Sequence, residues 1–319
     1  YEDFAKWVGR IKNTTIYMQI TNKRVVPLEH KIYLTEKQIY ICKTEKDIIK
    51  KDQIDLAIRD LGSLIEKNYY KQNSFKQNIT TGNNNYKQVQ QAYNKNYSNK
   101  GGTSFNNGPN QNRQKATSNK IIETASYLIK QKMTPAVIFV FSIKKIDEYA
   151  KDLAEQATNE NWIDRDDIAK ITKFFDRCIG ILSSEDQKIP QITKVKGLLQ
   201  KGIGVHHAGL LPILKETIEI LYSKGLIKVL FATTSFSIGL NMPTRSVVFT
   251  EVTKFNDMQK EVLSSSEYLQ MCGRAGRRGI DDKGHVFILL GEKGTPQSDE
   301  LSKMMKDGGT TVESKFRLS

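Results

Sequence analysis

The sequence predicts an α/β fold built on a parallel sheet flanked by helices, and two observations carry this prediction. Short apolar runs rich in β-branched residues recur along the chain, at 136–141, 202–205, 228–233, 246–250 and 285–290. Strands that are buried on both faces of a parallel sheet show this continuous apolar pattern. Amphipathic stretches at 144–156 and 212–224 lie between the runs and can supply the helices that connect parallel strands.

The boundaries of the second amphipathic stretch are marked in the sequence. Pro212 suits the first turn of a helix, and Gly225 suits the residue just past its end. In open α/β sheets the functional residues gather at the carboxyl ends of the strands. We therefore expect the site residues in the segments that follow the apolar runs.

The chain divides by composition. Residues 1–67 predict a strand-rich connector, with strands at 16–20 and 25–34 and a helix at 45–67. Residues 68–118 contain thirteen asparagines and neither Asp nor Glu, so they cannot offset their ordering entropy by burial, and we expect a disordered insertion there. The main domain is placed at 119–295, and a closing segment at 296–319.

Charge and composition narrow the class of protein only partly. The 49 basic and 35 acidic residues give a formal charge of +14, and seven of the basic residues fall in 68–118. The excess is compatible with a nucleic-acid partner and equally with a solvated surface. No apolar run approaches the about 20 residues that cross a bilayer, so we expect an intracellular protein without a membrane segment. Cys42, Cys178 and Cys272 lack CxxC spacing, which argues against disulfides and a zinc knuckle.

The segment 270–279 carries the strongest chemical signal. Its Arg274 and Arg277 are three residues apart, which predicts one helical face, and the interleaved glycines leave room for a phosphate. Guanidinium groups presented to a transferring phosphoryl group stabilise its developing charge. The alternative is a surface turn whose arginines contact solvent or RNA phosphate, and this segment alone does not decide between the two.

Four segments together resemble a known family. Residues 135–142, 204–212, 228–243 and 270–279 resemble, in order and spacing, motifs IV, IVa, V and VI of the DExH-box helicases of superfamily 2. The opening FAKWVGRIK, then VPLEH, the long insertion and the closing DELSKMM and SKFRLS are most similar to the superkiller (Ski) type. The resemblance implies that the chain forms the second RecA-like domain of an exosome-associated RNA helicase, which would start within 1–67. It also implies that 296–319 leads toward a winged-helix region.

The resemblance also implies roles for individual residues. Arg274 and Arg277 would face the ATP phosphates, with Gln270 as a coupling residue, while Gly239 and Asn241 would lie beside the nucleotide. The residues implied to contact the RNA backbone are Ser142, His207, Ala208, Gly209, Thr233 and Thr234. Thr234 departs from the family, which usually has an acidic residue at this position.

No GxxxxGK[ST] phosphate loop occurs in the chain, and no DExH sequence follows a buried strand. ATP with Mg²⁺ would therefore be held mainly by a first RecA-like domain that this chain lacks, and we expect the isolated chain to be inactive. The resemblance implies 3′ to 5′ movement on RNA, a cytoplasmic location, and partnership with the cytoplasmic exosome and with the tetratricopeptide and WD-repeat subunits of a Ski-type complex.

Several other interpretations stay open or are disfavoured. A nuclear surveillance or splicing-type DExH helicase, a polymerase-theta-like DNA helicase, and an RNA-binding scaffold without catalysis are the alternatives. A metal site at His206 and His207 is disfavoured because no acidic residue or cysteine stands at a suitable spacing. Asp147 and Glu148 imitate a DExx box, but they fall within an amphipathic stretch and not after a buried strand.

Overall fold

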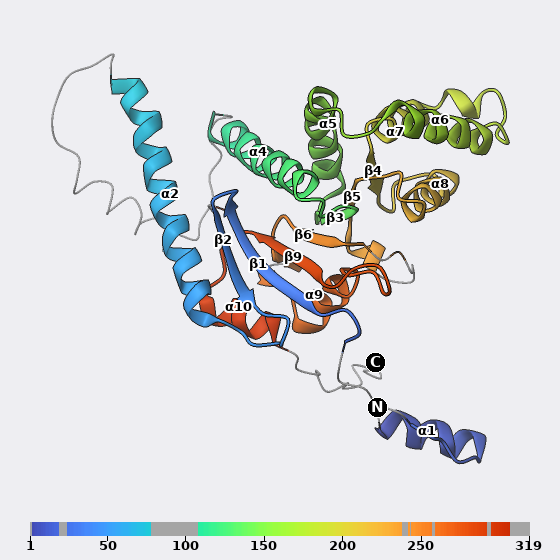
Figure 1. Cartoon of the computed structure of the whole chain (residues 1–319), viewed down its shortest axis with the longest axis horizontal. Helices are drawn as coiled ribbons and strands as arrows, with labels where there is room; N and C mark the ends of the chain where they lie inside the picture. Colours follow the sequence, from blue (N-terminus) through green and yellow to red (C-terminus); the bar gives the residue numbers. More distant parts are fainter. Residues whose placement is uncertain are drawn as a thin grey trace.

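The computed structural model describes residues 2–18, 24–77, 108–237, 242, 244–256, 259–291 and 295–306. A seven-stranded sheet forms its centre, in the order β2-β1-β9-β6-β3-β5-β4 (Figure 1). Its strands are β1 (Leu28–Thr35), β2 (Gln38–Lys43), β3 (Ala136–Phe139), β4 (Ile203–His206), β5 (Val229–Ala232), β6 (Ser246–Phe249) and β9 (Gly284–Leu289). Every pair is parallel except β1 with β2, so the predicted sheet is confirmed and gains one antiparallel edge strand.

The apolar runs form strands because both of their faces are covered. All residues of β3, β4, β5, β6 and β9 are buried. His30 and Tyr33, three residues apart in β1, show the two sides. The Tyr33 hydroxyl donates to Glu123 Oε1 of α4 at 3.2 Å, while His30 Nδ1 lies 2.6 Å from the Tyr268 hydroxyl of α9. Side chains therefore alternate between two helical layers, as a pleated strand requires.

Helices α4 and α5 cover one face, and α2, α9 and α10 cover the other, while α6, α7 and α8 pack around the β4 edge (Figure 1). The helices are α1 (Glu2–Lys12), α2 (Lys51–Gln77), α4 (Gly108–Lys130), α5 (Ile143–Glu160), α6 (Arg165–Ile179), α7 (Pro190–Leu199), α8 (Pro212–Ser223), α9 (Ser265–Cys272) and α10 (Ser298–Met305), with 3-10 turns η1 (Asp186–Lys188) and η2 (Thr234–Ser237). Both predicted crossover helices are present. Pro212 begins α8 and Gly225, with φ +74°, follows its end.

The amino-terminal part differs from the prediction in three places. Residues 16–18 are not a strand, and 19–23 lie outside the described residues. The helix expected from residue 45 begins at Lys51, because 43–50 form a turn closed by the Lys50 N–H donating to Cys42 O. The tract 68–118 is helical at both ends, in α2 and α4, whereas 78–107 lie outside the described residues.

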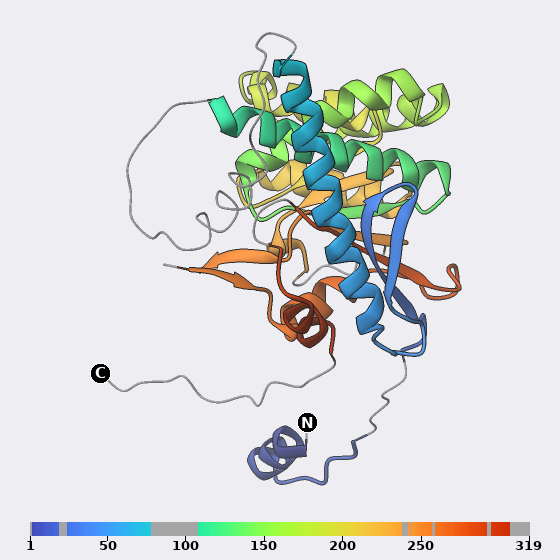
Figure 2. The ribbon, with the colours of Figure 1, turned by 90° about the vertical axis from the view of Figure 1, so that its left-hand side faces the viewer.

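Two further elements stand away from the main sheet. Helix α1 buries none of its residues and lies apart from the sheet in Figure 1. Strands β7 (Thr253–Asn256) and β8 (Gln259–Val262) form a separate antiparallel hairpin, which projects from the body in Figure 2. None of the helices described is long and apolar enough to cross a membrane.

Candidate nucleotide and RNA interfaces

The residues implied to contact RNA all lie at the carboxyl edge of the sheet. Ser142 follows β3, the turn 207–209 follows β4, and Thr233 and Thr234 follow β5. These three strands are neighbours in the order β3-β5-β4, so their trailing segments are adjacent. Backbone bonds join them: the Val140 N–H donates to Ala232 O at 2.9 Å, and the Thr233 N–H donates to His206 O at 3.3 Å. The structure therefore brings this group together at one edge of the sheet, and its contact with RNA stays a prediction.

Ser142 is placed at the start of a long helix. It is the N-cap residue of α5, with extended φ −143° and ψ 122°, yet its side chain makes no capping hydrogen bond. The first turn of α5 contains no acidic residue. The first backbone N–H groups of a helix have no partner within the helix and carry partial positive charge, so this end of α5 is suited to an anion such as phosphate.

The turn after β4 is held by its own side chains. The Gly209 N–H donates to His207 Nδ1 at 3.1 Å, and Gln191 of α7 donates to Gly209 O at 2.9 Å while accepting from the Leu211 N–H at 3.0 Å. The amides of Gly209 and Leu211 are thus bonded within the protein. Burial lowers the pKa of His207. The neutral ring accepts at Nδ1, so its proton is on Nε2, which becomes the donor.

The neighbouring His206 is buried and contacts other side chains of the domain. Its Nε2 lies 2.8 Å from Glu219 Oε1, and its ring packs edge-on against Phe236 with 5.1 Å between centroids. Within the described ranges, no group of three or more His, Cys, Asp or Glu side chains could hold a metal ion. Asp147 and Glu148 lie in α5, as predicted, and Asp147 pairs with Lys194 at 2.8 Å.

Arg274 and Arg277 lie at the opposite, amino edge of the sheet. The Thr244 N–H, two residues before β6, donates to Arg274 O at 2.9 Å, and the Gly276 N–H donates to Thr244 O at 2.7 Å. The rule that functional residues follow the strands therefore does not cover the arginines. The expectation that they share a helical face is also wrong, because α9 ends at Cys272. We call residues 273–277 the arginine turn.

Tight backbone contacts explain why the helix does not continue. Gly276 has φ +84°, a conformation that favours glycine, and a Cβ there would lie 2.5 Å from Val26 Cγ1. A Cβ on Gly284, the first residue of β9, would lie 2.7 Å from the backbone of both Ala275 and Gly276. The arginine turn therefore passes directly over the start of β9, and the two backbone segments are too close for a side chain at Gly284.

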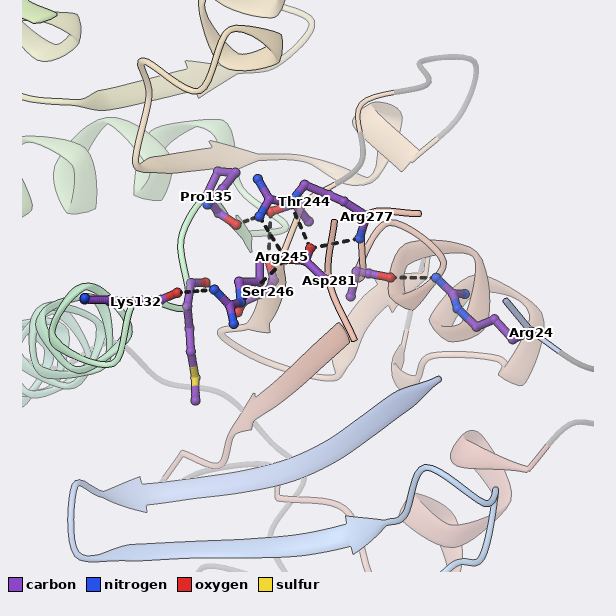
Figure 3. Close-up of polar contacts among 10 residues, drawn as sticks. Arg24, Lys132, Pro135, Thr244, Arg245, Ser246, Arg277 and Asp281 are labelled. Carbon is purple, nitrogen blue, oxygen red and sulfur yellow. Dashed lines mark hydrogen bonds and ion pairs between the residues drawn. The ribbon is translucent and has the colours of Figure 1, made fainter. Parts of the chain in front are cut away.

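A buried carboxylate fixes Arg277 (Figure 3). Asp281 accepts from Arg277 Nε and Nη2 at 2.8 Å each and from the Arg277 N–H at 2.9 Å, while its side chain is 2% exposed. Arg245 Nε approaches the same carboxylate at 3.7 Å. Although burial alone raises the pKa of Asp281, the hydrogen bonds from Arg277 outweigh this effect and leave it below the ordinary value. The pKa of Arg277 is raised by the same bonds.

Arg274 and Gln270 stand beside this cluster. Arg274 is half-buried, and partial loss of water lowers the pKa of its guanidinium. Gln270 lies in the last turn of α9. Gly239 and Asn241, implied to flank the nucleotide, lie outside the described residues.

A third arginine supports the turn from the amino-terminal segment. Arg24 Nη2 donates to Gly273 O at 3.0 Å and to Ala275 O at 2.6 Å, and its Nε donates to Val26 O at 2.8 Å. Figure 3 shows Arg24 reaching the turn from the side opposite Asp281. Arg24 thereby satisfies two carbonyls of the arginine turn, just beyond the end of α9.

Sequence reasoning missed Asp281, Arg24 and Gln191. Asp281 carried a usable signal, because a carboxylate four residues after an arginine can pair with it within one turn. Arg24 and Gln191 carried none, since their partners are 249 and 18 residues away along the chain.

Comparison with known proteins identifies the family to which this α/β domain belongs. Residues 164–279 match the helicase conserved C-terminal domain. The chain is 34% identical to the DExH-box ATP-dependent RNA helicase DExH11 of Arabidopsis thaliana over 99% of its length, 34% to human exosome RNA helicase MTR4 and 35% to human superkiller complex protein 2. It contains a helicase C-terminal domain of the type shared by these DExH-box helicases. The chain spans about a quarter of the length of these relatives, 24%, 26% and 23% respectively.

Proposed function

We propose that this chain is the C-terminal motor domain of an ATP-dependent 3′ to 5′ RNA helicase that feeds RNA to the cytoplasmic exosome. The amino edge meets the phosphates of ATP, and the carboxyl edge meets the RNA backbone. The observation that carries the proposal is the arginine turn. This turn lies within residues 164–279, the segment that matches the helicase conserved C-terminal domain.

The amino edge has the chemistry that phosphoryl transfer needs. Arg274 and Arg277 are both partly exposed, and Arg277 is held in one orientation by Asp281. Guanidinium groups placed against a transferring phosphoryl group stabilise its charge, and arginine fingers of this kind contribute about 10³ to 10⁵ in rate. Gln270, Gly239 and Asn241 complete the nucleotide side of the proposal.

The residues present fit one side of a bound ATP and not the whole of it. The arginines can meet phosphate oxygens, but the sequence has no GxxxxGK[ST] loop to enclose them. ATP with its Mg²⁺ would supply the phosphoryl group for hydrolysis when the first RecA-like domain, which this chain lacks, holds it. In this proposal the chain's own residues orient and neutralise phosphate, and closure of the gap between domains couples this to movement of RNA.

The carboxyl edge supports a grip on RNA that does not depend on base sequence. Ser142, His207, Ala208, Gly209, Thr233 and Thr234 offer hydroxyls, an imidazole and a helix start, and no aromatic platform. Hydroxyl and helix-terminus contacts to phosphate fix position without reading sequence. The proposed substrate is therefore single-stranded RNA of any sequence.

The compartment and the partners are assigned from the sequence of the opening segment and not from the geometry of the site. Identity is 34% to the exosome helicase MTR4 and 35% to superkiller complex protein 2, so similarity favours neither strongly. We assign the superkiller type, with tetratricopeptide and WD-repeat partners in the cytoplasm, from the opening segment and VPLEH. A nuclear surveillance or splicing-type DExH helicase is the second candidate. Imaging the tagged full-length protein separates the two, and nuclear retention would reject the cytoplasmic assignment.

The activity is tested by comparing this chain with the full-length protein from the same gene. We expect no RNA-stimulated ATP hydrolysis from the isolated chain, and hydrolysis by the full-length protein that single-stranded RNA stimulates more than DNA. Unwinding should require a 3′ single-stranded tail on the duplex. Turnover by the isolated chain at ordinary enzyme rates would reject the division of roles, and equal stimulation by DNA would reject the RNA substrate.

A further inference from the structure

The carboxylate of Asp281 contacts two arginines at the amino edge, Arg277 and Arg245, and the sequence did not single it out as a site residue. Its side chain is 2% exposed and accepts three hydrogen bonds from Arg277. We propose that Asp281 is the positioning residue for Arg277: it holds the guanidinium by one edge and leaves the other edge for a phosphate oxygen. The inference rests on the proposed function, which it deepens.

The geometry of the bond leaves donors available. A guanidinium carries five N–H groups, and Asp281 takes one from Nε and one from Nη2. Both N–H groups of Nη1 and the second of Nη2 point away from this side-on pair. Asp281 therefore occupies one edge of the fork, and a phosphate can be met by the other edge without breaking the pair.

The backbone is fixed together with the side chain. Asp281 Oδ2 also accepts the Arg277 N–H, and the Asp281 N–H donates to Arg277 O at 2.9 Å. Residues 277–281 thus form a turn closed from both directions. A long arginine side chain ordinarily loses considerable rotamer freedom when it binds, and this turn removes that freedom before any ligand arrives.

The carboxylate is itself anchored to the sheet through Arg245. The Arg245 N–H donates to Pro135 O at 3.0 Å, and its Nη1 donates to Lys132 O at 2.7 Å, so this arginine is tied to the segment before β3 (Figure 3). Its Nε faces Asp281 at 3.7 Å. The chain of contacts runs from the edge of the sheet through Arg245 and Asp281 to Arg277, and it sets the direction of the guanidinium relative to the fold.

The test is a double-mutant cycle in the full-length protein, with ATP turnover measured at saturating RNA. We expect Asp281→Asn to lower kcat by roughly 10- to 100-fold with little change in the KM for ATP, since misplacement of a catalytic group by about 1 Å costs on this order. Arg277→Ala should lower kcat by about 10³. Because Asp281 acts through Arg277, the double variant should equal Arg277→Ala alone, whereas independent effects would multiply.

Asp282→Asn is the matched control, since it removes the same charge from the exposed neighbouring residue and should leave kcat unchanged. If Asp281→Asn fails to fold, Asp281→Glu, which keeps the charge and displaces it by one methylene, takes its place in the cycle. Effects that multiply, or faster turnover in the Asp281 variant, would overturn the inference. Unchanged turnover in Arg277→Ala would instead reject the proposed function, so the two failures are distinct.

Discussion

The two edges of the sheet are built in different ways. At the carboxyl edge, Ser142, the turn 207–209 and Thr233 each follow a different strand. Ser142 and Thr233 lead directly into α5 and η2, and the turn 207–209 is held by Gln191 of α7, 18 residues before Gly209. At the amino edge, the arginine turn is contacted by Arg24, by Thr244 and by the segment from Asp281 to Gly284, which are three separate stretches of sequence.

This difference has a physical consequence. A residue that caps or follows its own strand keeps its place as long as that strand and helix form. The arginine turn has no regular structure of its own beyond α9, so its shape depends on partners across the sheet. Long-range positioning suits a group that must meet a ligand held by another domain, because its direction is then fixed relative to the whole fold.

The largest expected effect separates the edges by function. Arg274→Ala in the full-length protein should lower ATP turnover by about 10³, because the half-buried guanidinium is proposed to face the transferring phosphate. RNA affinity, measured by fluorescence anisotropy without nucleotide, should stay within about twofold since the RNA contacts lie at the other edge. Arg278→Ala, at an exposed residue of the same segment, is the control. A large loss of RNA affinity in Arg274→Ala would break the comparison.

The next effect tests whether backbone proximity shapes the arginine turn. Gly284→Ala places a Cβ 2.7 Å from the backbone of Ala275 and Gly276, so it should cost about 1–3 kcal/mol of stability and also lower turnover. Gly197→Ala in α7 meets nothing within 4 Å, and removal of a helical glycine should stabilise by about 0.5–1 kcal/mol. Urea denaturation measures both. Equal stability of the two variants would show that the turn can shift without cost.

A pH effect reports on α9, the helix that leads into the arginine turn. Burial lowers the pKa of His30, which contacts Tyr268 of α9, to about 3. Above about pH 6.5 the imidazole is neutral in both folded and unfolded chains; below it the unfolded chain takes up the proton first, so stability falls with pH down to about 3. From pH 7.5 to 5.5 this histidine should contribute a loss of about 1.4 kcal/mol. His30→Gln should flatten the pH dependence of unfolding by one proton, and parallel curves would contradict this.

The smallest effect lies at the carboxyl edge. Gln191→Ala removes the two hydrogen bonds that hold the turn after β4, and a bond of this kind is worth about 1 kcal/mol, so RNA affinity should weaken by roughly three- to tenfold. Turnover at saturating RNA should not change. Gln187→Ala, an exposed glutamine whose amide contacts Leu182 O, provides the control. Loss of turnover without loss of RNA affinity would reverse the assignment of the two edges.

The sheet and its carboxyl edge could be predicted from sequence because their signals are local. Each strand of the main domain is one apolar run, and Ser142 or Thr233 simply follows such a run. The antiparallel β2 escaped notice because its six residues, QIYICK, are only partly apolar. The helical ends of the tract 68–118 were missed because its polar composition hides them.

For the amino edge, the sequence identified the two arginines but not their conformation or their partners. Arg274 and Arg277 were found, but their spacing suggested a helix, and the glycine contacts that end it involve Gly284 and Val26, far away in sequence. Asp281 was hidden for another reason: a carboxylate near arginines is usually a solvated surface pair, and only its burial shows otherwise.

Arg24 gives the segment ahead of β1 a mechanical connection to the amino edge. Its guanidinium bonds Gly273 and Ala275 while its Nε is tied to Val26, two residues on. A pull or twist applied upstream would have to break these bonds or drag the carbonyls with it. Strain entering the domain along the peptide chain would thus reach the arginine turn through Arg24, without first disturbing the sheet.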